Sequence, residues 1–357
     1  MNFKSVDFKS NQGFTLLCTL LLCVLLITLV ASTALGAVSL DPKSVFGILV
    51  SKTTGIEYTD QAWSKAVENI VWNLRMPRTL LGVLAGAGFA LAGIMMQALT
   101  KNPLANPYIL GISSGATTGA VMVIVLGGIP FVGINSPAVG AFAGALITSL
   151  IVFMLASQNG GMSSTRLVLI GVSISALFSS VTSFIIFTAS DQNKVTSALF
   201  WMTGSLSGGK YENLLAPALG VGLSFIFIVI FSRGLNSLLL GENVAKTLGV
   251  NTVMLRRAIL VLSSILTGFL VANTGIIGFV GLIIPHVART IVGSDHKKVA
   301  VLSVLLGPIL VIWADVLARL IGRPEEIPLG VITAFLGAPF FIWLIQKNTY
   351  GFGGRNG

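Results

Sequence analysis

Few residues of this 357-residue chain could do chemistry, and those few lie within or beside apolar sequence. Asp315 and Arg319 are four residues apart, which places them on one face of a helix, close enough to pair. His286 and Arg289 are three residues apart in another apolar run. Ionisable residues inside membrane segments are by default functional candidates. Two hypotheses follow, a structural ion pair and a proton relay, and the relay would need several more such residues along a path.

The sequence contains no motif for metal binding or nucleotide hydrolysis. The motifs HExxH and CxxC and the phosphate-binding loop GxxxxGK[ST] are all missing. Cys18 and Cys23 would lie about 140° apart around a helix and are badly placed to bridge each other. We therefore expect no catalytic residue, no metal site and no cofactor bound by this chain.

The composition places these residues in a membrane protein. Apolar residues make up 54% of the chain and charged residues 10%, and the mean hydropathy is +0.92. Soluble domains are about 25% charged, so a soluble protein is excluded, and the high hydrophobicity excludes a disordered one. The long continuous apolar runs also exclude a β-barrel, whose strands alternate. The remaining fold class is an all-α polytopic membrane protein.

Ten apolar runs have about the length that crosses the hydrocarbon core of a bilayer, ~17–25 residues. We predict a single transmembrane domain over residues 1–357, with an N-terminal tail at 1–13. Pro285, His286 and Arg289 interrupt the eighth run. The ten runs are 14–38, 79–99, 109–126, 138–156, 167–188, 214–231, 258–273, 276–292, 299–320 and 329–346.

The distribution of charge predicts the orientation of the chain. The net charge of +10 would suggest nucleic acid in a soluble protein, but here it fits basic loops beside anionic lipid. With ten spans both termini share one side, which carries 13 Lys and Arg against nine on the other. Five of those nine lie in or just after one long outer loop, 39–78. The positive-inside rule makes the side of the termini cytoplasmic.

A cleaved signal peptide is the alternative reading of the first apolar run. Lys4 and Lys9 precede this run, and small residues follow it at 34–37. The run is 25 residues long, however, whereas the core of a signal peptide spans ~7–15 residues. We therefore favour a retained membrane helix.

Several polar or glycine-rich stretches interrupt the apolar pattern. They cover residues 101–107, 163–166, 203–209 and 273–281. Non-helical backbone at membrane depth is tolerated only where protein buries it or water reaches it. These breaks favour a transport path over a plain membrane scaffold or receptor.

The loop at 232–257 is predicted to hold a short amphipathic helix on the cytoplasmic side. Leu240, Val244 and Leu248 share one face of this helix, and Gly249 is suited to end it. A helix of this kind lies on a lipid surface or docks in a groove of a partner protein. The residues by themselves leave both hypotheses open.

The sequence resembles the permease subunits of type II ABC importers for iron–siderophore complexes, haem and vitamin B12. The resemblance covers most of residues 45–347, with the similar stretches in the order of that family. They are RMPRTL at 75–80, MQAL at 96–99, NPLANP at 102–107, LGISSGA at 110–116, GENVAKTLGV at 241–250, GFVGLIIPH at 278–286, EIPLG at 326–330 and GAPF at 337–340.

The resemblance implies ten transmembrane helices in two five-helix halves of inverted topology. It implies two permease subunits, identical or paralogous, with two ATPase subunits that bind ATP and Mg²⁺ and an extracytoplasmic binding protein. The amphipathic segment becomes a coupling helix that sits in a groove of the ATPase. Its implied contact residues are Leu240, Gly241, Glu242, Ala245, Leu248 and Gly249.

The resemblance also implies roles for residues along the path. Outer arginines would pair with glutamates of the binding protein. The alternative is snorkelling for Arg75 and Arg78, and pairing with Asp315 for Arg319. Two cytoplasmic gates and a fifth helix with small hydroxyl residues would form the path, with helix packing as the alternative for that helix. The docking residues are Arg75, Arg78, Arg319 and Arg323, the gate residues are Asn102, Ser164 and Thr165, and the lining residues are Ser173, Ser179, Ser180, Thr182 and Ser183.

Together these features predict the permease subunit of an ATP-driven importer, not an enzyme. We expect it in the bacterial cytoplasmic membrane, in contact with lipid, with both termini in the cytoplasm and no nucleic acid among its partners. An iron–siderophore-type chelate is the expected cargo, with haem and vitamin B12 as alternatives. A proton-coupled secondary carrier that uses Asp315 and His286 is the alternative from another class.

Overall fold

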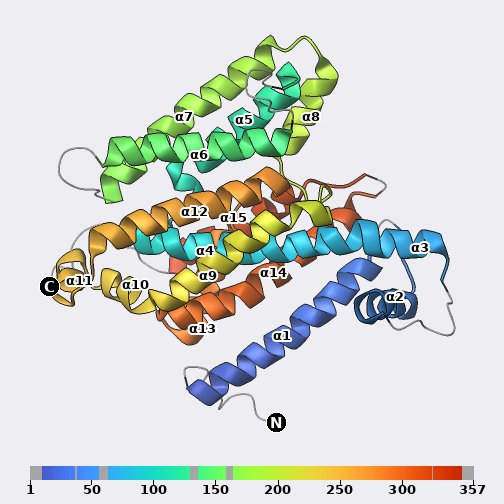
Figure 1. Ribbon diagram of the computed structural model, residues 1–357, viewed down its shortest axis with the longest axis horizontal. Helices are drawn as coiled ribbons and strands as arrows, with labels where there is room; N and C mark the ends of the chain where they lie inside the picture. The colour runs from blue at the N-terminus through green and yellow to red at the C-terminus, as the bar shows by residue number, and fades with distance from the viewer. Residues whose placement is uncertain are drawn as a thin grey trace.

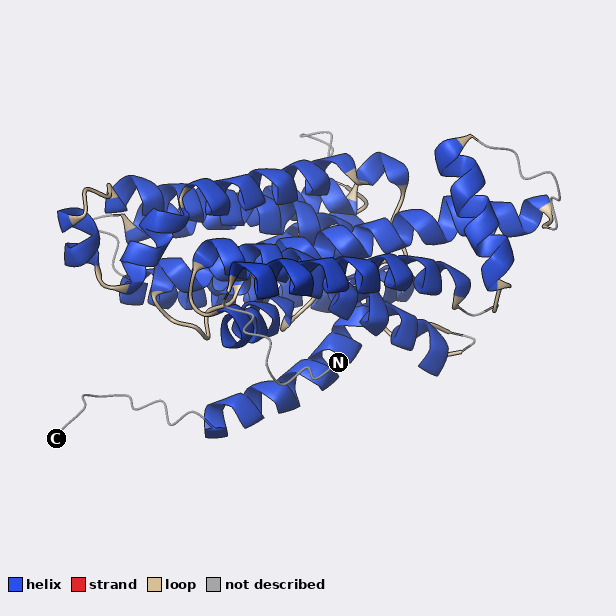
Figure 2. Cartoon of the chain, turned by 90° about the horizontal axis from the view of Figure 1, so that it is seen from below, coloured by secondary structure: helices blue, strands red, loops and turns tan. Residues whose placement is uncertain are grey.

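A computed structural model describes residues 10–36, 38–55, 63–128, 136–157, 164–323 and 325–347. These residues form helices joined by turns, with no strand among them (Figures 1 and 2). The predicted all-α fold is confirmed for this part of the chain. The first nine residues of the predicted tail at 1–13 lie outside the described residues.

Most of the long helices lie side by side along the long axis of the molecule (Figure 1). They are connected by shorter helices, several of which lie at the two ends of the bundle. The helices are α1 (Asn11–Ala34), α2 (Pro42–Thr54), α3 (Lys65–Asn69), the π-helical turn η2 (Ile70–Arg75), α4 (Met76–Thr100), η3 (Pro107–Leu110), α5 (Ile112–Leu126), α6 (Pro137–Ala156), α7 (Ser164–Thr188), α8 (Gln192–Met202), η5 (Tyr211–Asn213), α9 (Leu215–Ile230), α10 (Ser232–Leu239), α11 (Glu242–Thr247), α12 (Thr252–Thr274), α13 (Val280–Val292), α14 (His296–Ile321) and α15 (Leu329–Lys347).

Each predicted apolar run overlaps a helix, although the eighth, 276–292, begins in the break before α13 and the first, 14–38, extends past the end of α1. Among the described residues, seven helical stretches are long and apolar enough to cross a membrane, and α5, α13 and α15 contain shorter apolar helices. An apolar run folds as a helix because hydrocarbon offers its backbone no other hydrogen-bond partners. Ten membrane crossings and the inverted relation of the two halves stay predictions.

Helix α4 lies at the centre of the molecule, and every residue at 85–100 is buried. Two glycines of α4 allow other helices to approach its backbone closely. A Cβ on Gly86 would collide with the carbonyl of Gly307 in α14, and a Cβ on Gly93 would collide with the carbonyl of Gly281 in α13. Small residues at such crossings let membrane helices pack closely without a gap. The absence of side chains at Gly86 and Gly93 thus allows α14 and α13 to lie directly against α4.

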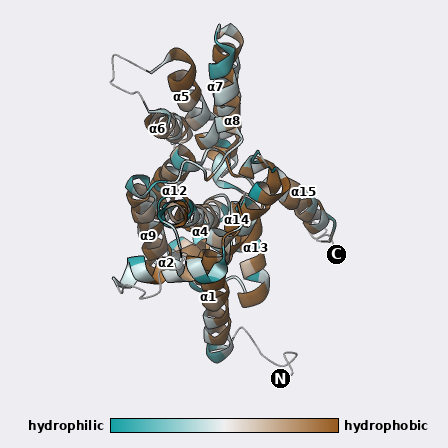
Figure 3. Cartoon of the chain, turned by 90° about the vertical axis from the view of Figure 1, so that its right-hand side faces the viewer, coloured by the Kyte–Doolittle hydropathy of each residue, from teal (hydrophilic) through white to brown (hydrophobic). Residues whose placement is uncertain are grey.

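Helices α5, α6, α7 and α8 form a layer, and α6 of this layer packs against α12 (Figure 1). In the view along the long axis this layer is separate from the other helices (Figure 3). Gly115 and Gly119 of α5 face Gly144 and Gly140 of α6. A Cβ on any of the four would press against the opposite backbone. These four glycines therefore allow the close packing of the two helices.

The outer segment at 39–78, predicted as a loop, contains α2, α3 and η2. Asp41 caps α2 by accepting a hydrogen bond from the Ser44 N–H at 3.0 Å, Pro42 begins the helix, and Gly55 ends it at a φ of 73°. One face of α2 packs against η2 and the end of α1. A 13-residue helix with a mixed composition gives too weak an apolar period to be predicted.

Candidate functional site

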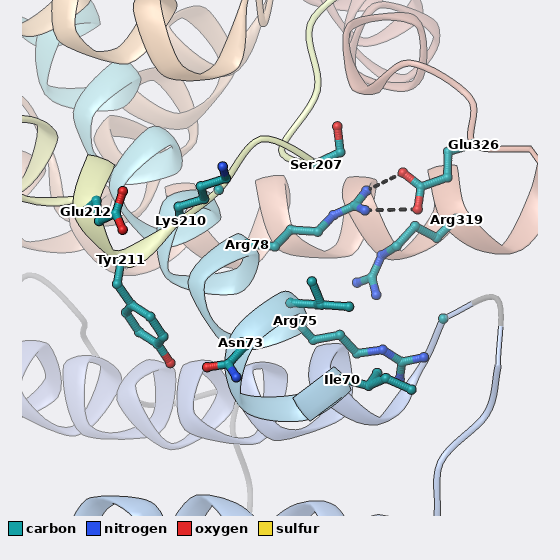
Figure 4. A pocket seen from close by; sticks show the side chains of 13 residues that line it. Ile70, Asn73, Arg75, Arg78, Ser207, Lys210, Tyr211, Glu212, Arg319 and Glu326 are labelled. Atoms are coloured by element: carbon teal, nitrogen blue, oxygen red, sulfur yellow. Dashed lines mark hydrogen bonds and ion pairs between the residues drawn. The ribbon is translucent and has the colours of Figure 1, made fainter. Parts of the chain in front are cut away.

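The outer arginines form a network with two carboxylates. Arg78 of α4 donates from Nε to both oxygens of Asp315 at 3.1 Å and from Nη2 to Oδ1 at 2.8 Å. The same guanidinium group reaches Glu326 at 2.9 Å (Figure 4). Arg319 Nε lies 3.0 Å from Asp315 Oδ2. Two arginines therefore share Asp315, and the charge of this buried carboxylate is matched within the chain.

The other donors of this cluster hold the outer end of α1. The last carbonyls of a helix lack partners within the helix, and the C-terminal end of a helix attracts cations. Three guanidinium groups supply both hydrogen bonds and positive charge at this end. One comes from η2, one from α14 and one from the turn after α14. Arg75 donates to the carbonyls of Thr33 and Ala34 at 2.8 and 2.9 Å, Arg319 to those of Ser32 and Leu35 at 3.2 and 2.7 Å, and Arg323 to that of Gly36.

A hollow of about 560 Å³ opens beside this network, on the side of the molecule that the sequence predicts to face outward (Figure 4). Lys210, Tyr211 and Glu212 line one of its walls, and the arginines line another. The Tyr211 hydroxyl donates to the Trp72 carbonyl at 2.8 Å and so joins the two walls. The hollow has charged groups of both signs and no group that stands out as a nucleophile.

These contacts change the prediction for the outer arginines. Arg75 and Arg319 are only 9% and 5% exposed and bind groups of their own chain. The side chain of Arg78 is 12% exposed and lies against two carboxylates. Arg319 makes the pairing with Asp315 that the sequence offered as its alternative to docking. Arg75 and Arg78, whose alternative was snorkelling, instead bind carbonyls and carboxylates of their own chain. The docking roles of all three stay predictions. Arg323 is exposed and stays the open candidate for a partner's carboxylate.

Sequence reasoning missed Glu326 as a site residue. It lies 248 residues from Arg78, so no helical spacing connects the two. The one available signal was the family-like stretch EIPLG directly after the last outer arginine. Only the packing of α4 against α14 brings the two groups together.

The loop at 232–257 forms two helices where the sequence predicts one. Helix α10 ends at Leu239 and α11 begins at Glu242. Gly241 lies between them with a φ of 117°, a conformation that side-chain-bearing residues rarely adopt, and the break follows from it. Gly249 follows α11 in the left-handed region at a φ of 79°, as its predicted role requires.

The predicted apolar face of this loop is uncovered. Leu240, Val244 and Leu248 are 68%, 42% and 64% exposed, whereas Ala245 is fully buried against the body of the protein. A hollow of about 670 Å³ lies beside Leu240 and Leu248. Several apolar side chains together on a polar loop are typical of an interaction surface.

Glu242 is held by basic residues on two helices. Its carboxylate lies 3.0 Å from Lys246 Nζ within α11 and 3.5 Å from Arg256 Nη1 of α12. The hydrogen bond from Lys246, together with the charges of Arg256, Lys246 and Lys101, lowers the pKa of Glu242 below its ordinary value. The group is therefore charged at neutral pH and ties α11 to α12.

The predicted gate residues lie on the turn after α4 and at the start of α7. Asn102 is exposed, and its side chain accepts a hydrogen bond from the Leu104 N–H at 2.9 Å, so it shapes its own turn. Helix α7 begins at Ser164, whose side chain lies outside the described residues, as does the loop at 158–163. Thr165 is exposed. The gating roles of these residues stay predictions.

Helix α7 divides the predicted lining residues into two groups. Thr182 is 4% exposed, and its hydroxyl lies 2.7 Å from that of Thr118 in α5. For Thr182 the structure favours helix packing over a place on the path. The four exposed residues stay candidates for the lining, namely Ser173, Ser179, Ser180 and Ser183.

The surroundings of Asp315 and His286 argue against a proton relay. Asp315 is buried between Arg78 and Arg319, which approach its carboxylate to 2.8 and 3.0 Å and occupy it within the chain. His286 packs edge-on against the ring of Phe340, with centroids 6.4 Å apart. Within the described ranges no group of three His, Cys, Asp or Glu could hold a metal ion.

The sequence matches the FecCD transport family over residues 24–347. The chain belongs to this family. It is 40% identical over 291 residues to the Fe(3+)-citrate import system permease protein of Bacillus subtilis, covering 80% of this chain and 84% of that one. It is 38% identical over 291 residues to the hemin transport system permease protein of Yersinia pestis, covering 80% and 86%.

A solved structure of the same class agrees with the fold of this FecCD-family permease. It is described as an inward-facing conformation of a metal-chelate type ABC transporter, and it superposes with a TM-score of 0.79 at 31% identity, covering 93% of this chain and 99% of that one. The protein is thus the membrane-embedded permease of an ABC importer, a class that works with ATPase and substrate-binding partners. The resemblance in the sequence motifs is confirmed.

Proposed function

We propose that this permease moves an iron–siderophore-type chelate into the cytoplasm. Relatives named for Fe(3+)-citrate and hemin support an iron chelate as cargo. The four exposed serines of α7 present small, uncharged groups, which suit a bulky complex that passes through without tight binding. Haem and vitamin B12 are the alternative cargos within the family.

The observation that carries the ATP-driven mechanism is the exposed face of Leu240, Val244 and Leu248. This face lies on the polar loop between α9 and α12, where a groove of an ATPase subunit would cover it. The proposed assembly has two permeases, two ATPases that bind ATP and Mg²⁺, and an extracytoplasmic binding protein. The permease lies in the bacterial cytoplasmic membrane with both termini inside, and it contributes no residue to ATP hydrolysis.

A charge placed on this face tests the proposed coupling. Leu248→Glu buries a carboxylate in the proposed groove, so we expect loss of ATPase association and of uptake. Asn243→Glu adds the same charge to an exposed residue about 100° from the centre of the apolar face and serves as the matched control. Uptake and co-purification of the ATPase are measured for both variants. Normal uptake by Leu248→Glu would overturn the proposed coupling.

The energy source that drives uptake distinguishes an ATP-driven importer from a proton-coupled secondary carrier. Proteoliposomes with the permease, the ATPase and the loaded binding protein are supplied with ATP or with a proton gradient alone. We expect uptake with ATP and none with the gradient. Uptake of the chelate by the permease alone under a proton gradient would support the carrier instead. Affinities of the binding protein for iron–siderophore, haem and cobalamin then identify the cargo.

A further inference from the structure

Two connections between long helices meet inside the helix bundle. One joins α4 to α5 through a turn and the short helix η3, which carries Tyr108, and the other is the break between α12 and α13 at 275–279. Phe279, at the end of the break, has a φ of 65°, which is unusual for a bulky residue, and its ring occupies the space beside Gly337 of α15. Such backbone persists only where neighbouring groups hold it firmly. Those contacts set how the surrounding helices lie.

Backbone hydrogen bonds hold the outer end of the break. The end of α12, where the break begins, is hydrogen-bonded to the turn after α8. The same turn is also hydrogen-bonded to the first residues of α15. All three segments lie on the outer side, close to the arginine network. The bonds run from Ser205 N to Thr274 O at 2.8 Å, from Leu329 N to Gly204 O at 2.9 Å and from Gly330 N to Thr203 O at 3.0 Å.

A side chain, that of Tyr108, holds the middle of the break. Its hydroxyl donates to the Ile277 carbonyl at 2.7 Å and accepts from the N–H of the same residue at 3.3 Å. Ile277 is 1% exposed, so water cannot replace these bonds. The N–H of Tyr108 donates to Asn106 Oδ1 at 2.7 Å, and its ring meets Phe89 of α4 edge-on. This hydroxyl therefore bonds to both the carbonyl and the N–H of Ile277 in the break and links the two segments.

We propose that Tyr108 is a positioning residue that keeps the turn at 102–107 in register with the outer side of the protein. This turn carries Asn102, so the meaning of the link for transport rests on the proposed function. The outer segments bind each other through backbone groups, which a side-chain substitution leaves in place. Tyr108 is the side chain that extends this connection to the turn. A displacement of the outer segments by a docking protein reaches the turn through this hydroxyl.

Tyr108→Phe removes the hydroxyl and keeps the ring against Phe89. Thr196→Val is the control, because the Thr196 hydroxyl also donates to a backbone carbonyl, that of Gln192 at 2.9 Å, but at an exposed site of α8. Both variants are assembled with the ATPase and reconstituted in nanodiscs and in proteoliposomes. Backbone amide exchange at 104–109 and at Ile277, ATP hydrolysis with and without the loaded binding protein, and uptake are then compared.

For Tyr108→Phe we expect exchange about tenfold faster at both Ile277 and the turn, the effect of losing one buried hydrogen bond. Basal ATP hydrolysis persists, while stimulation by the binding protein and uptake fall. Thr196→Val changes none of these. Faster exchange at Ile277 with unchanged exchange at the turn would overturn the proposal, and so would uptake and stimulation equal to those of the control. If the wild-type complex does not transport, the proposed function fails, and the exchange comparison still decides the link.

Discussion

Asp315 is tolerated within an apolar segment because two arginines face it. Arg78 and Arg319 approach its oxygens to 2.8 and 3.0 Å, and Arg78 also holds Glu326. Burying a single carboxylate is costly, whereas a pair with good geometry and further hydrogen bonds offsets much of that cost. The same arginines keep the outer end of α1 in place, so these charges mainly organise the outer side of the protein.

Removal of Arg78 should destabilise the protein strongly. Arg78→Ala leaves Glu326 unpaired and takes away three of the hydrogen bonds to Asp315, so we expect a loss of about 3 kcal/mol in the free energy of unfolding. Arg323→Ala, at an exposed site, should cost less than about 1 kcal/mol. Denaturant unfolding of the purified permease in detergent compares the two. Equal losses would contradict the assigned network.

The ion pairs of Glu242 predict a dependence of α11 on pH. Its pKa in the folded protein lies below the ordinary value of 4.5, so its stabilising contribution is complete above about pH 4.5. The contribution is lost as the pH falls through the lowered pKa, because protonation removes the attraction to Lys246 and Arg256. We expect the protection of the α11 amides, measured against the intrinsic exchange rate at each pH, to fall over that window. Glu242→Gln should show low protection at all pH values, and a wild-type protection that does not change with pH would refute the role of these pairs.

At the scale of helices, glycine decides where backbones touch and where a helix breaks. Gly86 permits the close crossing of α4 and α14, whereas Gly241 separates α10 from α11 by its positive φ. The break turns the apolar face of the loop outward, where Leu240 and Leu248 are 68% and 64% exposed. A continuous helix through this segment would direct these side chains differently.

Alanine at the α4–α14 crossing should force the two helices apart. In Gly86→Ala the new methyl group would collide with the Gly307 carbonyl, so we expect a destabilisation of about 1–3 kcal/mol. Gly222→Ala in α9 is the matched control, since a Cβ there meets nothing within 4 Å. This control should be neutral or slightly stabilising, because alanine favours helix. Both are measured by thermal unfolding in detergent, and a neutral Gly86→Ala would contradict the crossing.

At the scale of the whole molecule, α7 and α15 expose large apolar side chains. Phe187 of α7 is 91% exposed and Phe335 of α15 is 78% exposed. Lipid covers such groups in part, and a second permease subunit is the further partner that the proposed function requires. The exposed serines of α7 would then lie on the path, apart from the buried Thr182.

Cysteine labelling distinguishes a lining residue from a packing residue on α7. In a background without Cys18 and Cys23, we expect Ser180→Cys to react with a hydrophilic thiol reagent in the assembled importer. Thr182→Cys should stay unlabelled, because its position is 4% exposed and packed against Thr118. Loading with the chelate should slow the first reaction. Labelling of both positions at the same rate would show that the division of α7 into two faces is wrong.

Contacts between residues that are far apart in the sequence could not be predicted from it. The pairing of Asp315 with Arg319 was predictable, because residues four apart lie on the same face of a helix. The pairing of Arg78 with Asp315 and Glu326 was not, since 237 and 248 residues separate these groups. The same holds for Tyr108 and Ile277, 169 residues apart. No local pattern records which helices become neighbours.

The sequence alone determined the class of the fold and the family. Continuous apolar runs must fold as helices in a membrane, since each backbone group then has a partner within its own segment, and the family motifs are contiguous in the chain. Only the tertiary structure decided which way the outer arginines point, that α2 and α3 occupy the outer segment, and that Gly241 divides the loop into α10 and α11. These features depend on contacts between distant segments, and such contacts are set by the close packing of the helices around α4.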